Sequence, residues 1–202
     1  MIQWQKGGED MDKDAILQNT RLYVMDAMQK NDPAHDTGHI QRVVRLAMRL
    51  QKKYPLADSF RTQMLAWLHD LCDDKLQANM GSAAVEEFLR EQDLPEEDIV
   101  FLVEGIGYIS YRKFPKLPKN TPIEVQIVQD ADRIDAMGAV GIARTFAYGG
   151  AHNRSLQSSL AHFDDKLLRL YDLLSTDEAK RLAKPRYDFL KEFYRQFQQE
   201  WQ

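Results

Sequence analysis

Apolar side chains recur at steps of three and four residues along most of this chain, and this spacing constrains the fold more than any other feature. Because an α-helix turns about every 3.6 residues, the spacing gathers apolar side chains into one stripe that must be buried. No segment alternates convincingly with the period of two that a half-buried strand requires. The pattern therefore predicts an all-α fold, in which amphipathic helices pack around a shared core.

Start and stop signals divide the pattern into helices. The first is expected over residues 12–30, before Pro33, and the second begins where Asp36 or Thr37 can cap it. A third helix is predicted over residues 58–72. The apolar stripe of the second helix consists of Ile40, Val43, Val44, Ala47 and Leu50.

The second half of the chain continues with helices that are interrupted by one clear loop. Residues 112–122 hold three prolines and four cations, a composition typical of a loop. A long helix is predicted over residues 123–147, ending at Gly149–Gly150. Ser175 and Glu178 have the spacing of a capping box, so the last helix is expected to follow them.

Length and composition fit one domain. The chain has 202 residues, of which 44% are apolar, and it shows no repeat and no linker, so residues 1–202 are expected to form a single domain. Residues 1–11 are a candidate disordered segment. The net charge of -4 gives no overall basic field, which argues against long nucleic acid as a partner.

The compartment is expected to be the cytoplasm. The start of the chain lacks the apolar core of a signal peptide, and no apolar run reaches the ~18 residues of a membrane span. The single cysteine, Cys72, suits a reducing compartment. Aromatic residues such as Trp4 and Trp201 suggest contacts between copies, which makes a homodimer a candidate assembly.

Three clusters of ionisable residues interrupt the apolar pattern: His35 to Val43, Leu65 to Lys75 and Gln129 to Gly138. Each lies in a segment whose other residues should be buried, and a buried charge is costly unless it is paired or bound to a metal ion. Taken singly, each cluster has an ordinary interpretation. A lone histidine on an apolar helix is usually a hydrogen-bonded core residue, and neighbouring aspartates usually form a solvated helix end.

A metal site is the alternative interpretation. His69 and Asp70 are neighbours and lie about 100° apart around a helix, so both can reach one ion at its edge. Because such an ion needs about four to six ligands, other helices must contribute. His39 and Asp132 lie in other apolar segments and would complete a set of two nitrogens and two carboxylates. This set suits Mn²⁺, Fe²⁺, Co²⁺, Ni²⁺ or Zn²⁺ better than Ca²⁺.

The third cluster also allows a plainer interpretation. Asp130, Asp132 and Asp135, together with Arg133, could form an exposed helix face with a local salt bridge. Cys72 is interpreted as a small apolar filler of the core. What argues for a site is that all three clusters occur together, in this order and at this spacing.

Together the clusters resemble a known family. The order His39, His69 with Asp70, and Asp132 matches the H…HD…D signature of the HD-domain metal-dependent phosphohydrolases. The longer stretches HDTGHIQRVVRLA and VQDADRIDAMGAVGIARTFAYGG are similar to one branch of small bacterial hydrolases. The similarity runs from about residue 35 to residue 150 and extends through HFDDKLLRL toward the C-terminus.

The resemblance implies an all-helical bundle with one divalent ion at its centre. The ligands that it implies are His39, His69, Asp70 and Asp132. His35 competes for the first position, but His39 is the histidine followed by the family's arginine and valine. Asp130 competes for the last position, but Asp132 is the aspartate followed by an arginine and an apolar residue.

General chemistry and the resemblance together assign roles to neighbouring residues. A divalent ion lowers the pKa of a bound water, which makes that water a nucleophile for phosphorus. Asp73 lies one turn after His69, where several relatives carry an acid, so it is the candidate to orient or deprotonate the water, with Asp74 as a second acid–base candidate. The residues expected to contact the substrate are Lys75, Arg42, Arg144, His35 and Lys166.

The leading hypothesis is a metal-dependent phosphohydrolase that cleaves (deoxy)nucleoside triphosphates to monophosphate and pyrophosphate. Mn²⁺ is the expected ion, with Mg²⁺, Co²⁺, Ni²⁺, Fe²⁺ or Zn²⁺ as alternatives, and the preference for triphosphates comes from the branch resemblance alone. A 5'-nucleotidase, a phosphodiesterase acting on another small phosphate ester, and a catalytically silent metal-binding sensor remain alternatives. A di-iron oxygenase is disfavoured, because the chain has no Glu-x-x-His pair.

Overall fold

The structure is a computed structural model of the chain, and it describes residues 11–28, 37–72, 80–111 and 113–201. In these residues the regular structure is helical throughout, which confirms the predicted all-α class. The α-helices are α1 (Lys13–Ala27), α2 (Thr37–Gln51), α3 (Ser59–Leu68), α4 (Gly81–Glu91), α5 (Glu96–Ile109), α6 (Ile123–Asp135), α7 (Gly138–Ala151), α8 (Leu156–Asp165) and α9 (Asp177–Glu200), and the short 3-10 helices are η2 (Leu167–Arg169) and η3 (Tyr171–Leu173).

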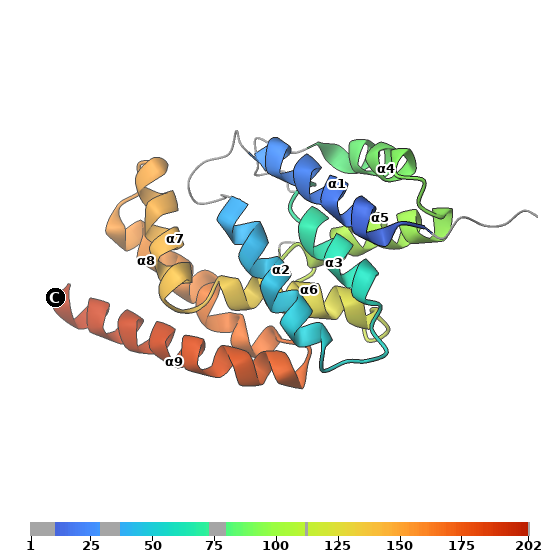
Figure 1. Cartoon of the computed structure of the whole chain (residues 1–202). Coiled ribbons are helices and arrows are strands. Elements are labelled where there is room, and N and C mark those ends of the chain that lie inside the picture. Colours follow the sequence, from blue (N-terminus) through green and yellow to red (C-terminus); the bar gives the residue numbers. More distant parts are fainter. Residues whose placement is uncertain (1–10, 29–36, 73–79, 112, 202) are drawn as a thin grey trace, which may run out of the picture.

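Three helices form the middle of the molecule. In Figure 1, α2, α3 and α6 lie between α1, α4 and α5 on one side and α7 and α8 on the other, while α9 runs along the lower edge. Helix α2 packs against both α3 and α6, and α5 covers α3 and α6 in turn. The predicted stripe of α2 is buried throughout, and every residue of α3 from Met64 to Leu68 is buried as well.

The helix predicted over residues 123–147 is wrong, because the chain forms two helices there. Helix α6 ends at Asp135 and α7 begins at Gly138, whose φ of +76° favours glycine because other residues rarely adopt it. Gly141 is equally constrained, since a Cβ there would lie 2.1 Å from the carbonyl oxygen of Ala136. The break turns the chain between α6 and α7, whereas the predicted terminators at Gly149–Gly150 lie inside α7.

Helix α3 is shorter than the predicted helix over residues 58–72. The Asp58 carboxylate caps it by accepting a hydrogen bond from the Arg61 backbone N–H at 2.8 Å. It ends at Leu68, after which the chain turns and the Leu71 N–H donates to the Leu68 carbonyl oxygen at 3.0 Å. His69 and Asp70 therefore follow the helix instead of lying within it.

Other boundaries fall near their predicted positions. Residues 113–122 form an irregular connection, as expected of the proline-rich loop. Helix α9 is capped by Thr176, whose hydroxyl accepts from the Ala179 N–H, so the predicted Ser175 cap is one residue early. The predicted disordered segment lies outside the described residues up to residue 10. None of the described helices combines the length and the apolar character needed to cross a membrane.

Candidate metal centre

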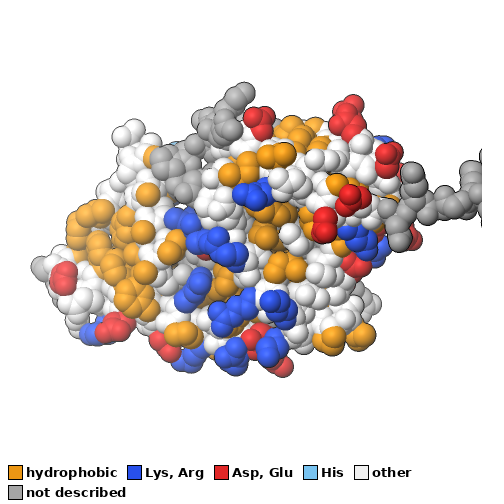
Figure 2. Space-filling model, in the orientation of Figure 1, with side chains coloured by type: hydrophobic (Ala, Val, Ile, Leu, Met, Phe, Trp, Pro, Cys, Tyr) orange, Lys and Arg blue, Asp and Glu red, His pale blue; other side chains and the backbone are white. Residues whose placement is uncertain are grey.

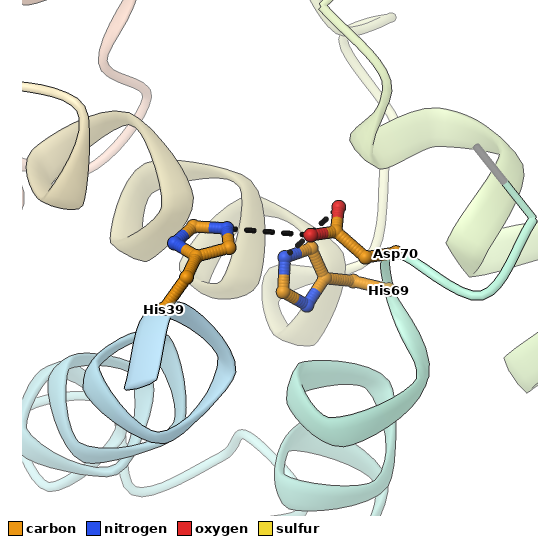
Figure 3. Close-up of side chains that lie close together, drawn as sticks. All are labelled: His39, His69 and Asp70. Carbon is orange, nitrogen blue, oxygen red and sulfur yellow. Dashed lines mark ion pairs between the residues drawn. The ribbon is translucent and has the colours of Figure 1, made fainter. Parts of the chain in front are cut away.

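Side chains from two of the predicted clusters converge at the end of α3. His39 projects from the first turn of α2, and His69 and Asp70 come from the turn after α3. One potential ligand atom of each residue lies within 4.8 Å of the others, and Figure 3 shows the three side chains pointing toward one another. His39 and His69 are buried, at 3% and 6% exposure. Residues 30 positions apart thus form one compact group with two nitrogens and a carboxylate.

The Asp70 carboxylate bridges the two imidazole rings. Asp70 places Oδ2 3.4 Å from His39 Nε2 and Oδ1 3.3 Å from His69 Nε2. Asp132, in α6, places Oδ1 3.4 Å from the same His39 Nε2. The structure therefore brings three of the four predicted ligands, His39, His69 and Asp70, into one group, and the fourth, Asp132, lies beside His39 Nε2.

The tautomer of His69 can be assigned from its backbone partner. Its Nδ1 lies 2.9 Å from the Ala66 carbonyl oxygen, which can only accept, so Nδ1 carries the proton. In the neutral ring Nε2 then presents a lone pair, and this atom is buried and has no hydrogen-bond partner among the described residues. A buried acceptor without a partner is costly, and a divalent cation would satisfy it. The residues present thus fit a metal ion.

His39 has a more polar environment, which includes a residue that the sequence did not single out. Its Nδ1 lies 2.8 Å from Oδ2 of Asp135, a carboxylate of α6 that is only 1% exposed. Burial alone would lower the pKa of His39, but hydrogen bonds to Asp135 and Asp70 outweigh it and raise the pKa to about 9. The surroundings therefore favour a positive charge at His39, which either a proton or a metal ion can supply.

Asp135 also holds the two arginines that were predicted to bind phosphate. Arg42 donates from Nε to Oδ1 at 2.8 Å and from Nη2 to Oδ2 at 3.1 Å, and Arg144 of α7 donates from Nη1 to Oδ2 at 3.0 Å. Burial by itself would raise the pKa of Asp135, but the hydrogen bonds from His39 and Arg42 keep it well below its usual range. Asp135 is thus a buried anion with three cationic neighbours.

Asp130, which competed with Asp132 in the sequence, has a different task. Its carboxylate accepts from the backbone N–H groups of Ser175 and Thr176 at 2.9 and 2.8 Å, and from the Thr176 hydroxyl at 2.8 Å. These contacts tie α6 to the start of α9. Of the two competing aspartates, Asp132 is the one with a contact to His39 Nε2.

The remaining predicted site residues are less well placed by the structure. Lys166 lies between α8 and η2, with its ammonium group 5.0 Å from the ring centre of Tyr111. The other predicted residues lie outside the described part of the chain, and their roles stay predictions: His35, Asp73, Asp74 and Lys75. Sequence reasoning missed Asp135, although its three-residue step from Asp132 places both on one side of α6.

Comparisons with known proteins show the family to which the chain is similar. The sequence pattern of the family described as HD domain matches residues 37–137. An uncharacterised protein, YpgQ of Bacillus subtilis, is 38% identical over 187 residues, which cover 89% of this chain and 91% of that protein.

Solved structures extend the similarity over nearly the whole chain. Bacillus subtilis YpgQ in complex with ADP superposes with a TM-score of 0.80 at 35% identity, covering 93% of this chain and 96% of YpgQ. A protein from Lactobacillus plantarum gives a TM-score of 0.83 at 32% identity, covering 93% and 97%. An HD-superfamily hydrolase from Bacillus thuringiensis gives a TM-score of 0.74 at 36% identity, covering 94% and 98%.

Proposed function

This chain belongs to the HD-domain family of metal-dependent phosphohydrolases, and we propose that it hydrolyses nucleotides, cleaving (deoxy)nucleoside triphosphates to monophosphate and pyrophosphate. The observation that carries the proposal is the buried His39, His69 and Asp70 group in a fold whose relative YpgQ was crystallised with ADP. A nucleotide is therefore the substrate class to test first.

The proposed ligands of the metal ion are His39, His69, Asp70 and Asp132. Their donor set of imidazole nitrogens and carboxylate oxygens suits first-row divalent ions, and we propose Mn²⁺, with Mg²⁺, Co²⁺, Ni²⁺, Fe²⁺ and Zn²⁺ as competitors. When bound, such an ion supplies a Lewis acid that polarises phosphate oxygens and lowers the pKa of water.

The chain's own residues would bind and orient the phosphates. The side chains of Arg42 and Arg144 are 27% and 21% exposed, so neither is fully enclosed by the protein. Both guanidinium groups are cationic and lie beside Asp135, so we propose that they contact the phosphate oxygens of the substrate. Asp73 remains the proposed residue for orienting or deprotonating water, with Asp74 as the second candidate.

The test is a panel of nucleoside mono-, di- and triphosphates incubated with the purified protein and Mn²⁺. Pyrophosphate and inorganic phosphate are assayed separately, and a His69→Ala protein purified in the same way controls for contaminating activity. Release of pyrophosphate and monophosphate in equal amounts from triphosphates is the expected result. Release of phosphate from monophosphates would instead identify a 5'-nucleotidase, and no release from any compound would overturn the proposal.

A further inference from the structure

Asp135 connects three helices at the metal centre. It lies in the last turn of α6, receives hydrogen bonds from His39 and Arg42 of α2, and receives another from Arg144 of α7. Its side chain is 1% exposed, so these contacts have little competition from water. A charged side chain this deeply buried is stable only when its hydrogen bonds are satisfied.

The contact with His39 decides which ring nitrogen faces the other carboxylates. A carboxylate only accepts hydrogen bonds, so a proton on Nδ1 points toward Asp135 at 2.8 Å. Nε2, 3.4 Å from an oxygen of both Asp70 and Asp132, is then the nitrogen available to an ion. Arg144 Nη1 also lies 3.0 Å from Nδ1, which would allow the opposite tautomer if Nδ1 accepted from Arg144.

Charge favours the first arrangement. The negative carboxylate of Asp135 stabilises a proton on Nδ1, whereas an unprotonated Nδ1 would place two lone pairs against each other at 2.8 Å. The two arginines donate to the same carboxylate as His39, and Arg144 Nη1 also lies 3.0 Å from His39 Nδ1. Loss of Asp135 would remove the carboxylate that His39, Arg42 and Arg144 share.

We propose that Asp135 is a positioning residue that fixes His39 with Nε2 toward the metal ion and holds Arg42 and Arg144 at the edge where the substrate phosphates bind. The metal half of this inference rests on the proposed ligands, and the arginine half rests on the proposed nucleotide substrate. Outer contacts of this kind typically contribute about 10- to 100-fold to metal affinity.

The same helix provides a matched control. Asp130 is also a buried aspartate of α6, at 0% exposure, with three hydrogen bonds of 2.8–2.9 Å. Its partners belong to the start of α9 and not to the metal group. Asp130→Asn therefore changes a buried, hydrogen-bonded carboxyl group of α6 without touching His39, Arg42 or Arg144.

The first experiment measures the Mn²⁺ dissociation constant by electron paramagnetic resonance of free Mn²⁺, together with thermal unfolding, for the wild type, Asp135→Asn and Asp130→Asn. We expect both variants to unfold at lower temperature, but only Asp135→Asn to bind Mn²⁺ about 10- to 100-fold more weakly. Its KM for the nucleotide is expected to rise as well, because the arginines lose their common partner. Wild-type affinity in Asp135→Asn, or equal weakening in both variants, would overturn the proposal.

A second measurement needs no variant and therefore does not depend on how well Asp135→Asn folds. ¹⁵N NMR of the histidine side chains in the wild-type protein loaded with Zn²⁺ reports which nitrogen carries the proton. The proposal requires His39 to be protonated at Nδ1 and bound through Nε2, and the reverse would contradict it. If the wild type binds metal but cleaves no nucleotide, the proposed function fails, while these two readouts still decide the role of Asp135 at the metal.

Discussion

The middle of the molecule and its C-terminal flank are built from different side chains. The centre, formed by α2, α3 and α6, is packed with aliphatic residues such as Ile40, Leu65 and Ile127, all at 0% exposure. The flank, formed by α7, α8 and α9, is packed with aromatic rings, and Phe146 and Phe197 stack with their centroids 5.7 Å apart. Figure 2 shows hydrophobic side chains at the surface over α7 and α8, whereas cations gather near α2 and α9.

The two regions differ in role: the centre positions the proposed metal ligands, whereas the flank packs beside it. All four proposed metal ligands come from α2, α6 and the turn after α3, where tightly packed aliphatic side chains resist displacement. The flank contributes Arg144, which reaches the centre through Asp135. Two large aromatic side chains of the flank stay partly in solvent, Phe189 at 48% and Trp201 at 50% exposure. Changes in the centre should therefore have larger effects than changes in the flank.

The largest expected effect comes from the ligands themselves. His69→Ala or Asp132→Ala should remove the metal ion and lower kcat/KM by more than about 100-fold, since even an outer contact costs up to that much. The helical circular dichroism spectrum should change little. Metal content by mass spectrometry and nucleotide turnover check this, with exposed Asp165→Ala as a control. Full metal content and turnover in Asp132→Ala would show that the ligand assignment is wrong.

A core substitution in the centre should come next. Leu65→Ala removes a fully buried side chain of α3 and should lower the free energy of unfolding by about 2–5 kcal/mol. Urea unfolding followed by circular dichroism measures this loss as a lower midpoint. A loss below about 1 kcal/mol would mean that the centre can collapse around the cavity and is less rigid than its packing indicates.

The stability of the metal-free protein should fall gradually as the pH rises, because of the buried charge on His39 at the centre. The pKa of His39 is about 9 in the folded protein, above its ordinary value of 6.5, so folding favours the protonated ring. The stabilisation is fully present below pH 6.5 and is lost as the pH rises through 9. Urea midpoints of protein treated with a chelator should fall over this range, whereas a constant midpoint would contradict the role of the buried charge.

The smallest effect is expected at the exposed aromatic side chains of the flank. Phe189→Ala should change the free energy of unfolding by about 0.5 kcal/mol or less, and metal affinity should not change. Trp201→Ala, measured by analytical ultracentrifugation, also tests the predicted homodimer. A loss of stability equal to that of Leu65→Ala would remove the contrast between the two regions.

The sequence predicted the features that depend on periodicity. The stripe of α2 could be read from apolar spacing, because burial of one helix face needs no information about partners. The break between α6 and α7 could not, because Ala136, Met137 and Gly138 continue a helical pattern, and only the positive φ of Gly138 shows the turn. Asp135 was missed for a related reason. Three aspartates on α6 look alike in sequence, and their roles depend on which helices pack beside them.

The contacts of Asp135 with His39, Arg42 and Arg144 also limit which substitutions can persist during evolution. A substitution at Arg42 or Arg144 would remove a positive charge beside the buried, ionised carboxylate of Asp135. Because Asp135 also contacts His39, the electrostatic environment of His39 would change as well. Few single substitutions at these positions could be tolerated, whereas simultaneous substitutions could preserve the balance between the buried negative charge and its positive neighbours. Positions 42, 135 and 144 should therefore vary together among descendants of this chain, although they lie up to 102 residues apart in the printed sequence.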